Sequence, residues 1–171
     1  METLFNCDED KLTFNQSNSY DYRGVQKHCK KNGLPEEWAK DLVDNADEEH
    51  PYAVANNDKI KYSRIKWKDY GVWRVFIAQF IGTGDYNKVN MWIDDKMGAT
   101  GTTWTHRCNS KEEAERVYSY VNIPEYKWII NELKVNGRIT SKVIDLPIVS
   151  LSKILSKEQM SYIRSHIINE E

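Results

Sequence analysis

Apolar positions near the start of the chain recur at the spacing of a helix. A helix is predicted over residues 20–32, with Gly33 following as a stop signal. Its apolar face would carry Tyr22, Val25 and Cys29. A second helix is predicted to begin at Pro35, because proline suits the first turn of a helix. Its apolar stripe would comprise Trp38, Leu42, Val43 and Ala46.

The pattern changes near residue 59 to short apolar and polar alternations, which are typical of β-strands. The predicted strands cover residues 59–67, 72–81, 88–94 and 102–108. Segment 72–81 is apolar along most of its length, as expected of a central strand. A loop at 82–87 and a turn at 95–101 would join the later strands, so the sequence predicts an antiparallel meander.

Helical spacing returns after Ser110, and each helix has a recognisable start. Ser110 with Glu113, and Ser156 with Gln159, form two capping boxes. Pro124 would open a helix between them, and Asn136-Gly137 is predicted to end it. The apolar positions on these three helices are Ala114, Val117, Tyr118 and Val121, then Tyr126, Ile129, Ile130 and Leu133, then Met160, Ile163 and Ile167.

These elements predict an α+β fold, with N-terminal helices, a central antiparallel meander and C-terminal helices packed on the sheet. Residues 1–58 would form a polar segment and a helical hairpin, and residues 59–171 a mixed recognition domain, together one compact unit. The chain shows no basic and apolar leader and no long apolar run. Three cysteines without paired spacing favour free thiols in the cytoplasm.

Charge is unevenly distributed, although the formal net charge is only −2. Residues 35–58 hold eight acids against one lysine, whereas residues 59–107 hold nine bases against four acids. Four of the six tryptophans lie in that basic stretch. A polyanion would most readily bind there, whereas the alternative interpretation is a sheet whose solvent face is rich in Lys and Arg.

The sequence offers little for catalysis or cofactor binding. Gly82-Thr-Gly84 follows a predicted strand, but the next segment also reads as a strand, so a hairpin loop is favoured over a phosphate-binding loop. His28-Cys29 and His106-x-Cys108 have poor spacing for a metal site. No nucleophile has a base at a suggestive spacing. We therefore expect a non-catalytic chain with no cofactor and no metal.

Recognition of DNA is the remaining hypothesis. Lys and Arg neutralise phosphates, and guanidinium and hydroxyl groups read base edges. Trp67 and Trp104 are flanked by polar residues and are expected to be exposed, whereas Trp73 and Trp128 are expected in the core; burial of every tryptophan is the alternative. Hydroxyls at Thr102, Thr103 and Thr105 would lie among them. The candidate DNA contacts are Arg64, Lys66, Lys68, Trp104, Arg107, Arg138 and Lys142.

The second half of the chain resembles a known family in the order of its elements and in their pattern of apolar and polar residues. The order is a β-segment ending in Thr102-Thr-Trp-Thr-His-Arg107, then the helices from Ser110 and Pro124, then Arg138-Ile-Thr-Ser-Lys-Val-Ile-Asp-Leu-Pro-Ile148 and a closing helix. This order resembles the C-terminal target-recognition region of N6-adenine DNA methyltransferases of restriction-modification systems. The resemblance covers about residues 72–168 and implies duplex DNA as the partner.

The chain also departs from that family. The family's N-P-P-Y/F tetrad is missing, and the nearest string is Glu49-His-Pro-Tyr52. The resemblance therefore implies a detached specificity domain that serves a catalytic methyltransferase or endonuclease subunit. The alternative function is a protein-interaction module, such as a phage or mobile-element protein that binds a host enzyme through the acidic surface of residues 35–58.

Overall fold

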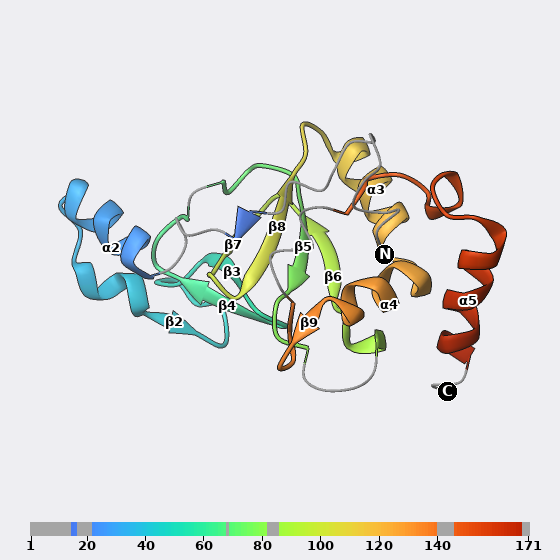
Figure 1. The fold of residues 1–171 in the computed structure, drawn as a ribbon. Helices are drawn as coiled ribbons and strands as arrows, with labels where there is room; N and C mark the ends of the chain where they lie inside the picture. The colour runs from blue at the N-terminus through green and yellow to red at the C-terminus, as the bar shows by residue number, and fades with distance from the viewer. Residues whose placement is uncertain (1–14, 17–21, 68, 82–85, 140–145, 169–171) are drawn as a thin grey trace.

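Two small sheets lie side by side in the middle of the molecule, between helices on either side (Figure 1). The computed structural model describes residues 15–16, 22–67, 69–81, 86–139 and 146–168 of the 171-residue chain. Sheet one has the order β1-β8-β5-β6 and is antiparallel throughout. Its strands are β1 (Asn15–Gln16), β5 (Arg74–Ala78), β6 (Met91–Asp94) and β8 (Thr103–Arg107).

Sheet two contains the shorter strands of the N-terminal half, in the order β2-β4-β3-β7. They are β2 (Leu42–Val43), β3 (Tyr52–Asn56), β4 (Lys59–Ser63) and β7 (Met97–Ala99). The β3–β4 and β2–β4 pairs are antiparallel, whereas β3 and β7 are parallel. Buried residues Ala55, Phe76, Met97 and Ala99 pack the two sheets together.

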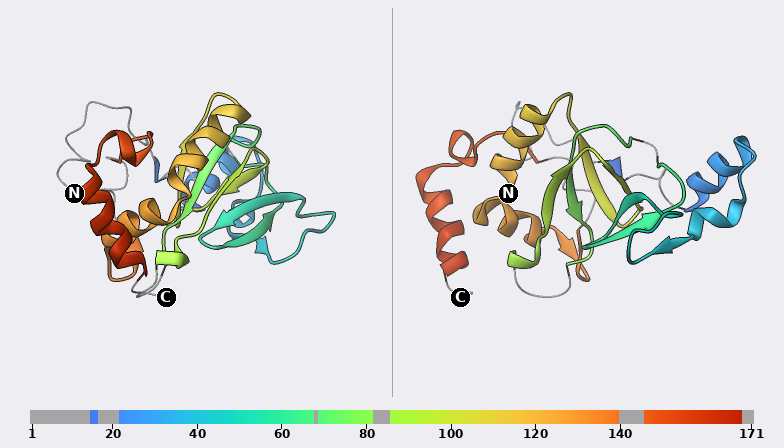
Figure 2. Two further views of the ribbon diagram at one scale, coloured as in Figure 1. Left: turned by 90° about the vertical axis from the view of Figure 1, so that its right-hand side faces the viewer. Right: turned by 180° about the vertical axis from the view of Figure 1, so that it is seen from behind.

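Helices cover the outer faces of both sheets (Figure 2). On the side of sheet two lie α2 (Tyr22–Lys31) and the 3₁₀ helix η1 (Glu36–Lys40). On the side of sheet one lie α3 (Lys111–Val121) and α4 (Pro124–Glu132), with α5 (Lys157–Ile168) outermost. Two further 3₁₀ helices, η2 (Tyr86–Lys88) and η4 (Leu151–Lys153), and the hairpin of β9 (Lys134–Val135) and β10 (Arg138–Ile139) complete the described elements.

The α+β class is confirmed, and the strongest local patterns form the predicted elements. All five residues of β5 are buried, as its apolar run predicts for a central strand. Alternation sends Val75 and Ile77 toward the helices and Phe76 toward sheet two. Both predicted caps form: Ser110 accepts a hydrogen bond from the Glu113 backbone, and Ser156 accepts one from Gln159.

The helix predicted from Pro35 is wrong beyond its first turns. η1 ends at Lys40, and Leu42 and Val43 instead pair with Tyr62 and Ser63 of β4. The Asp41 side chain, just past the end of η1, is bound by Arg64 and His50 rather than facing solvent along a helix. Tertiary pairing has therefore overridden an amphipathic pattern, as it commonly does for short segments.

The strand order also differs from a simple meander. The segment predicted as a turn at 95–101 contains β7, which leaves sheet one and adds a parallel strand to sheet two. The chain then returns as β8 beside β5, on the side away from β6. β3 lay outside the predicted strands, and the predicted boundary at residues 58/59 falls inside the turn of the β3–β4 hairpin.

Asn136-Gly137 has a different role from the predicted one. Both residues have positive φ, 51° and 73°, as a type I′ hairpin turn requires. They connect β9 to β10, while α4 has already ended at Glu132. Among the described residues no helix combines the length and the apolar composition needed to cross a membrane.

Candidate nucleic-acid interface

The candidate DNA contacts do not form one patch. Lys68 and Lys142 lie outside the described residues. Lys66 and Arg107 lie near the turn that leads into β5, and Arg138 lies beyond the other end of that strand. Arg64 is held in a cluster of ion pairs, and Trp104 is in the core. The five described candidates therefore occupy four different environments.

Arg64 is part of an ionic cluster rather than an open basic surface. Its Nε lies 2.6 Å from Asp41 Oδ2, another of its nitrogens contacts Glu49, and its guanidinium carbon lies 5.7 Å from the centre of the Trp38 ring. The neighbouring carboxylates, Asp41 foremost, raise the pKa of Arg64 above its usual value. These contacts tie η1 and the following loop to the end of β4, which is a structural role.

His50 completes this ionic cluster from the other side. Its two ring nitrogens lie 2.8 Å from Asp47 Oδ1 and 3.1 Å from Asp41 Oδ2, and the residue is only 5% exposed. Hydrogen bonds to Asp47 and Asp41 raise the pKa of His50. The same contacts lower the pKa of Asp47, and those from Arg64 and His50 lower that of Asp41. Both carboxylates thus favour the imidazolium form.

Half of the eight acids in segment 35–58 are therefore engaged within the protein. Asp44 contacts Lys61 across the β2–β4 pair, which lowers the pKa of its carboxyl. Four exposed acids of this segment have no such cationic partner: Glu36, Glu37, Glu48 and Asp58. Because the other four carboxylates neutralise His50, Arg64 and Lys61, the segment presents a smaller acidic surface than its sequence predicts.

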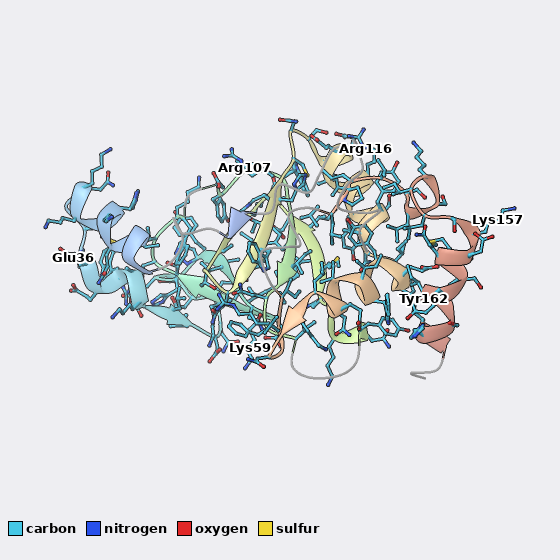
Figure 3. The ribbon with its side chains drawn as sticks, in the orientation of Figure 1. Glu36, Lys59, Arg107, Arg116, Lys157 and Tyr162 are labelled. Carbon is cyan, nitrogen blue, oxygen red and sulfur yellow. The ribbon has the colours of Figure 1, made fainter. Side chains whose placement is uncertain are left out.

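Lys66 and Arg107 each contact a residue of the turn before β5. The Lys66 ammonium lies 5.2 Å from the centre of the Tyr70 ring, and Arg107 lies 3.5 Å from Asp69. Both basic side chains are exposed, and Figure 3 shows Arg107 at the upper edge of sheet one. These two bases gather at a single turn, Lys66 from just before it and Arg107 from the end of β8, and Asp69 partly balances their charge.

The prediction that Trp67 and Trp104 are exposed is wrong. Each is 4% exposed, Trp67 beneath α2 and Trp104 beneath the C-terminal helices. Both faces of β8 are covered, so the polar neighbours Thr103 and Thr105 are buried as well and do not indicate solvent. Trp104 therefore cannot contact DNA in this fold. Trp128 is in the core as predicted. Trp73 was also predicted in the core, but it is only partly buried and packs against the same apolar cluster.

Two of the threonines predicted to read base edges, Thr102 and Thr103, instead support a turn together with Thr100. Thr103 Oγ1 accepts a hydrogen bond of 3.1 Å from the Asn57 backbone. Thr100 and Thr102 donate to Asn56 Oδ1 at 3.0 and 3.3 Å. These bonds attach the β3–β4 turn to the start of β8, and so hold this end of sheet two against sheet one.

Phe80 lies at that end, just past β5, and it is 45% exposed. Its backbone forms a bridge with Arg138, and the Arg138 guanidinium carbon lies 5.3 Å from the centre of the Phe80 ring. The Asn57 side chain makes two hydrogen bonds to the Phe80 backbone. Its Nδ2 donates to the Phe80 carbonyl at 2.9 Å, and its Oδ1 accepts from the Phe80 amide at 2.7 Å. The ring is thus presented on a fixed backbone.

The two hairpins joined to this pair carry further exposed side chains. Ile60 is 49% exposed on β4, and Val135 is 60% exposed opposite Arg138 in the β9–β10 hairpin. Lys59 is exposed beside the same turn and is visible near β9 in Figure 3. We call this surface the Phe80–Arg138 edge, comprising Asn57, Lys59, Ile60, Phe80, Val135 and Arg138. Of these six residues, only Arg138 was predicted from the sequence. The Asn57-Asp58 and Asn136-Gly137 pairs are typical of hairpin turns, and they were the sequence features that could have indicated the other five.

Two other features lie away from this edge. A cleft of about 380 Å³ between η4 and α5 is lined by Ser152, Leu155, Lys157, Met160, Ser161 and Arg164. The two cysteines of the split His-Cys pairs sit in separate cores, Cys29 on α2 and Cys108 just past β8, and His28 is exposed. Within the described ranges, no three His, Cys, Asp or Glu side chains converge in a way that could hold a metal ion.

Comparison with known proteins finds no family model, no curated protein and no solved structure that matches this chain. The resemblance to methyltransferase target-recognition regions therefore stays a prediction.

Proposed function

We propose that this chain is a non-catalytic, sequence-specific DNA-binding domain that contacts a short duplex site through the Phe80–Arg138 edge. The observation that carries the proposal is the exposed Phe80 ring with the Arg138 guanidinium 5.3 Å from its centre. Arginine is the side chain most often used for phosphate and guanine contacts, because its planar fork makes paired hydrogen bonds. Here that fork lies on a fixed backbone at the surface.

A second group of basic residues, Lys66 and Arg107, supports a contact with an extended polyanion. Arg107 pairs with Arg74 at the start of β5, whereas Phe80 lies two residues past its end. Six residues of extended chain span about 20 Å. Phosphate contacts by Lys66 and Arg107 at one end, and by Lys59 and Arg138 at the other, would fix the orientation of a duplex without carrying sequence information themselves.

The proposal includes a partner and a cellular setting. Following the resemblance, the domain would supply specificity to a catalytic methyltransferase or endonuclease subunit. Such a subunit would provide further phosphate contacts, which makes a net charge of −2 acceptable for a DNA-binding chain. Cys29 and Cys108 are buried and unbridged, which supports a reducing, cytoplasmic setting.

Fluorescence anisotropy with a randomised, labelled duplex at two salt concentrations tests the proposal. We expect salt-sensitive binding and enrichment of one short motif from the bound pool. Arg138→Glu should weaken binding by at least the ~1–3 kcal/mol typical of a lost arginine contact. Arg116→Glu is the matched control, because Arg116 is an exposed arginine on α3, away from the edge (Figure 3).

Two results would contradict the proposal. Equal losses for Arg138→Glu and Arg116→Glu would mean that binding follows overall charge and not this edge. Absence of binding at low salt would instead favour the protein-interaction module, and the exposed carboxylates Glu36, Glu37 and Glu48 would become the surface to mutate.

A further inference from the structure

The chemistry of Phe80 distinguishes it from the basic residues around it. A phenyl ring has no hydrogen-bonding group, so it reads little from the groove edges of paired bases beyond the methyl group of thymine. Its flat face can stack on a base, but the faces of bases in an intact duplex are already covered by their neighbours. An exposed aromatic ring on a nucleic-acid surface is therefore best suited to bases that have left the stack.

The ring is also prepared for such a contact. Two hydrogen bonds from one side chain, Asn57, fix the backbone of Phe80, and Asn57 itself adopts a left-handed φ of 60°. The Thr103 hydroxyl in turn holds the Asn57 amide. Because the backbone beneath the ring is already ordered, little conformational entropy would be lost when a ligand binds.

The surroundings of the ring match one nucleotide. The two hairpins that contact its backbone each carry an exposed apolar side chain, Ile60 and Val135, and the Arg138 guanidinium offers a second flat surface for stacking. Lys59 and Arg138 supply positive charge for the adjoining phosphates. Asp58 is the acid next to Asn57 in the sequence, and its carboxylate accepts a 3.2 Å hydrogen bond from the Asn57 side-chain amide.

We propose that the Phe80–Arg138 edge binds an unpaired nucleotide within or beside a duplex, with its base stacked on Phe80 and its phosphates near Lys59 and Arg138. This inference rests on the proposed DNA-binding function and names the class of DNA that the edge prefers. A bulged nucleotide or a single-stranded overhang would meet the requirement, whereas a fully paired duplex would engage only the basic side chains.

Three labelled duplexes of one sequence test the inference by anisotropy: a matched duplex, the same duplex with a single-nucleotide bulge, and the bulged duplex with an abasic sugar in place of the extra base. We expect the bulged duplex to bind about tenfold more tightly than the other two, in line with stacking of one base on one aromatic ring. A 2-aminopurine at the bulge should lose fluorescence when the protein binds.

Variants assign the preference to the ring. Phe80→Ala should bring the bulged duplex to the affinity of the matched one, and Phe80→Trp should keep the preference. Tyr162→Ala is the control, because Tyr162 is an even more accessible aromatic residue, 60% exposed against 45% for Phe80, on the outer helix α5. It should leave the preference for the bulge intact.

The outcomes separate this inference from the function on which it rests. Equal binding of matched and bulged duplexes, or a preference that survives Phe80→Ala, would overturn the inference and leave duplex binding standing. Equal binding of the bulged and abasic duplexes would show that DNA flexibility, not the base, is recognised, and would also overturn it. Failure to bind all three duplexes would overturn the proposed function as well.

Discussion

The two helical sides of the molecule are built on different principles. On the C-terminal side, α3, α4 and α5 cover sheet one through a continuous apolar core, in which Val117, Tyr126, Ile129 and Ile130 are almost fully buried. On the N-terminal side, α2 and η1 cover sheet two through a core of only six buried residues, Val25, Cys29, Ala39, Val54, Ile65 and Trp67. On this side, hydrogen bonds and ion pairs therefore add to the packing of the smaller apolar core.

The smaller core is supplemented in two ways. The Trp67 indole donates a 3.0 Å hydrogen bond to Ser63 Oγ, which also accepts from the Ile65 backbone. The ionic cluster of Asp41, Asp47, Glu49, His50 and Arg64 ties the loop after η1 to β4. Hydrophobic burial tolerates small changes of shape, whereas hydrogen bonds and ion pairs depend on geometry and on protonation. The two sides should therefore respond to different perturbations.

The largest effect is expected on the C-terminal side. Ile129→Ala removes a fully buried side chain of α4, and we expect the free energy of unfolding to fall by about 2–5 kcal/mol. Ile60→Ala makes the same chemical change at a position that is 49% exposed, and should stay within about 0.5 kcal/mol of wild type. Urea denaturation followed by circular dichroism measures both. Similar losses for the two variants would contradict the core assignment.

A close contact should give the next effect, on the N-terminal side. A Cβ at Gly98 would lie 2.7 Å from Trp67 Cβ and 2.9 Å from its Cγ, and the Trp67 Cβ cannot move away unless the backbone moves with it. Gly98→Ala should therefore destabilise the protein by about 1–3 kcal/mol through overpacking. Tryptophan fluorescence and urea denaturation report it. Unchanged stability would show that α2 and Trp67 move outward freely.

The ionic cluster predicts a smaller, pH-dependent effect. The pKa of His50 is raised above its usual value near 6.5, so its contribution to stability is complete below that pH and is lost as pH rises through the higher pKa of the folded protein. The lowered pKa values of Asp41 and Asp47 act oppositely, because their contribution is lost as pH falls through them. Stability should therefore peak in the mildly acidic range.

Thermal unfolding between pH 5 and pH 9 measures this dependence. The wild-type midpoint should decrease on the alkaline side, and His50→Gln should remove most of that decrease. His28→Gln, at an exposed position on α2, is the control and should retain the wild-type profile. An unchanged pH profile in His50→Gln would contradict the assigned role of the imidazolium.

The same contrast explains what the sequence could predict. The three C-terminal helices were predictable, because each has a start signal and an apolar stripe within its own segment: a capping serine for α3 and α5, and Pro124 for α4. Leu42 and Val43 looked equally helical, but their partners are Ser63 and Tyr62, about twenty residues away. β7 has only three residues, and its pairing with Ala53 to Ala55 leaves no local signal. At β2 and β7, pairing with residues far away in the sequence determined the secondary structure, which the local pattern could not predict.

The candidate site was less predictable than the fold. Basic and aromatic residues in strands 59–107 indicated a polyanion surface, but burial of Trp104 depends on helices packed from later in the chain. Arg64 was counted as an available base because its partners Asp41 and Glu49 precede it by 23 and 15 positions. Phe80 was missed because its exposure follows from the end of β5 meeting two hairpin turns, which no single segment reveals.

The parallel pairing of β3 with β7 has a consequence for how the chain acquires its structure. Sheet two begins with residues near position 42 and is finished by residues 97–99, after β5 and β6 of sheet one have been passed. A growing chain that has reached only β6 can form the β3–β4 hairpin, but it lacks the strand that covers the other edge of β3. Such an edge is open to pairing with other chains. Folding of the N-terminal layer must therefore wait for the sheet that follows it, and the two sheets should mature in one late step.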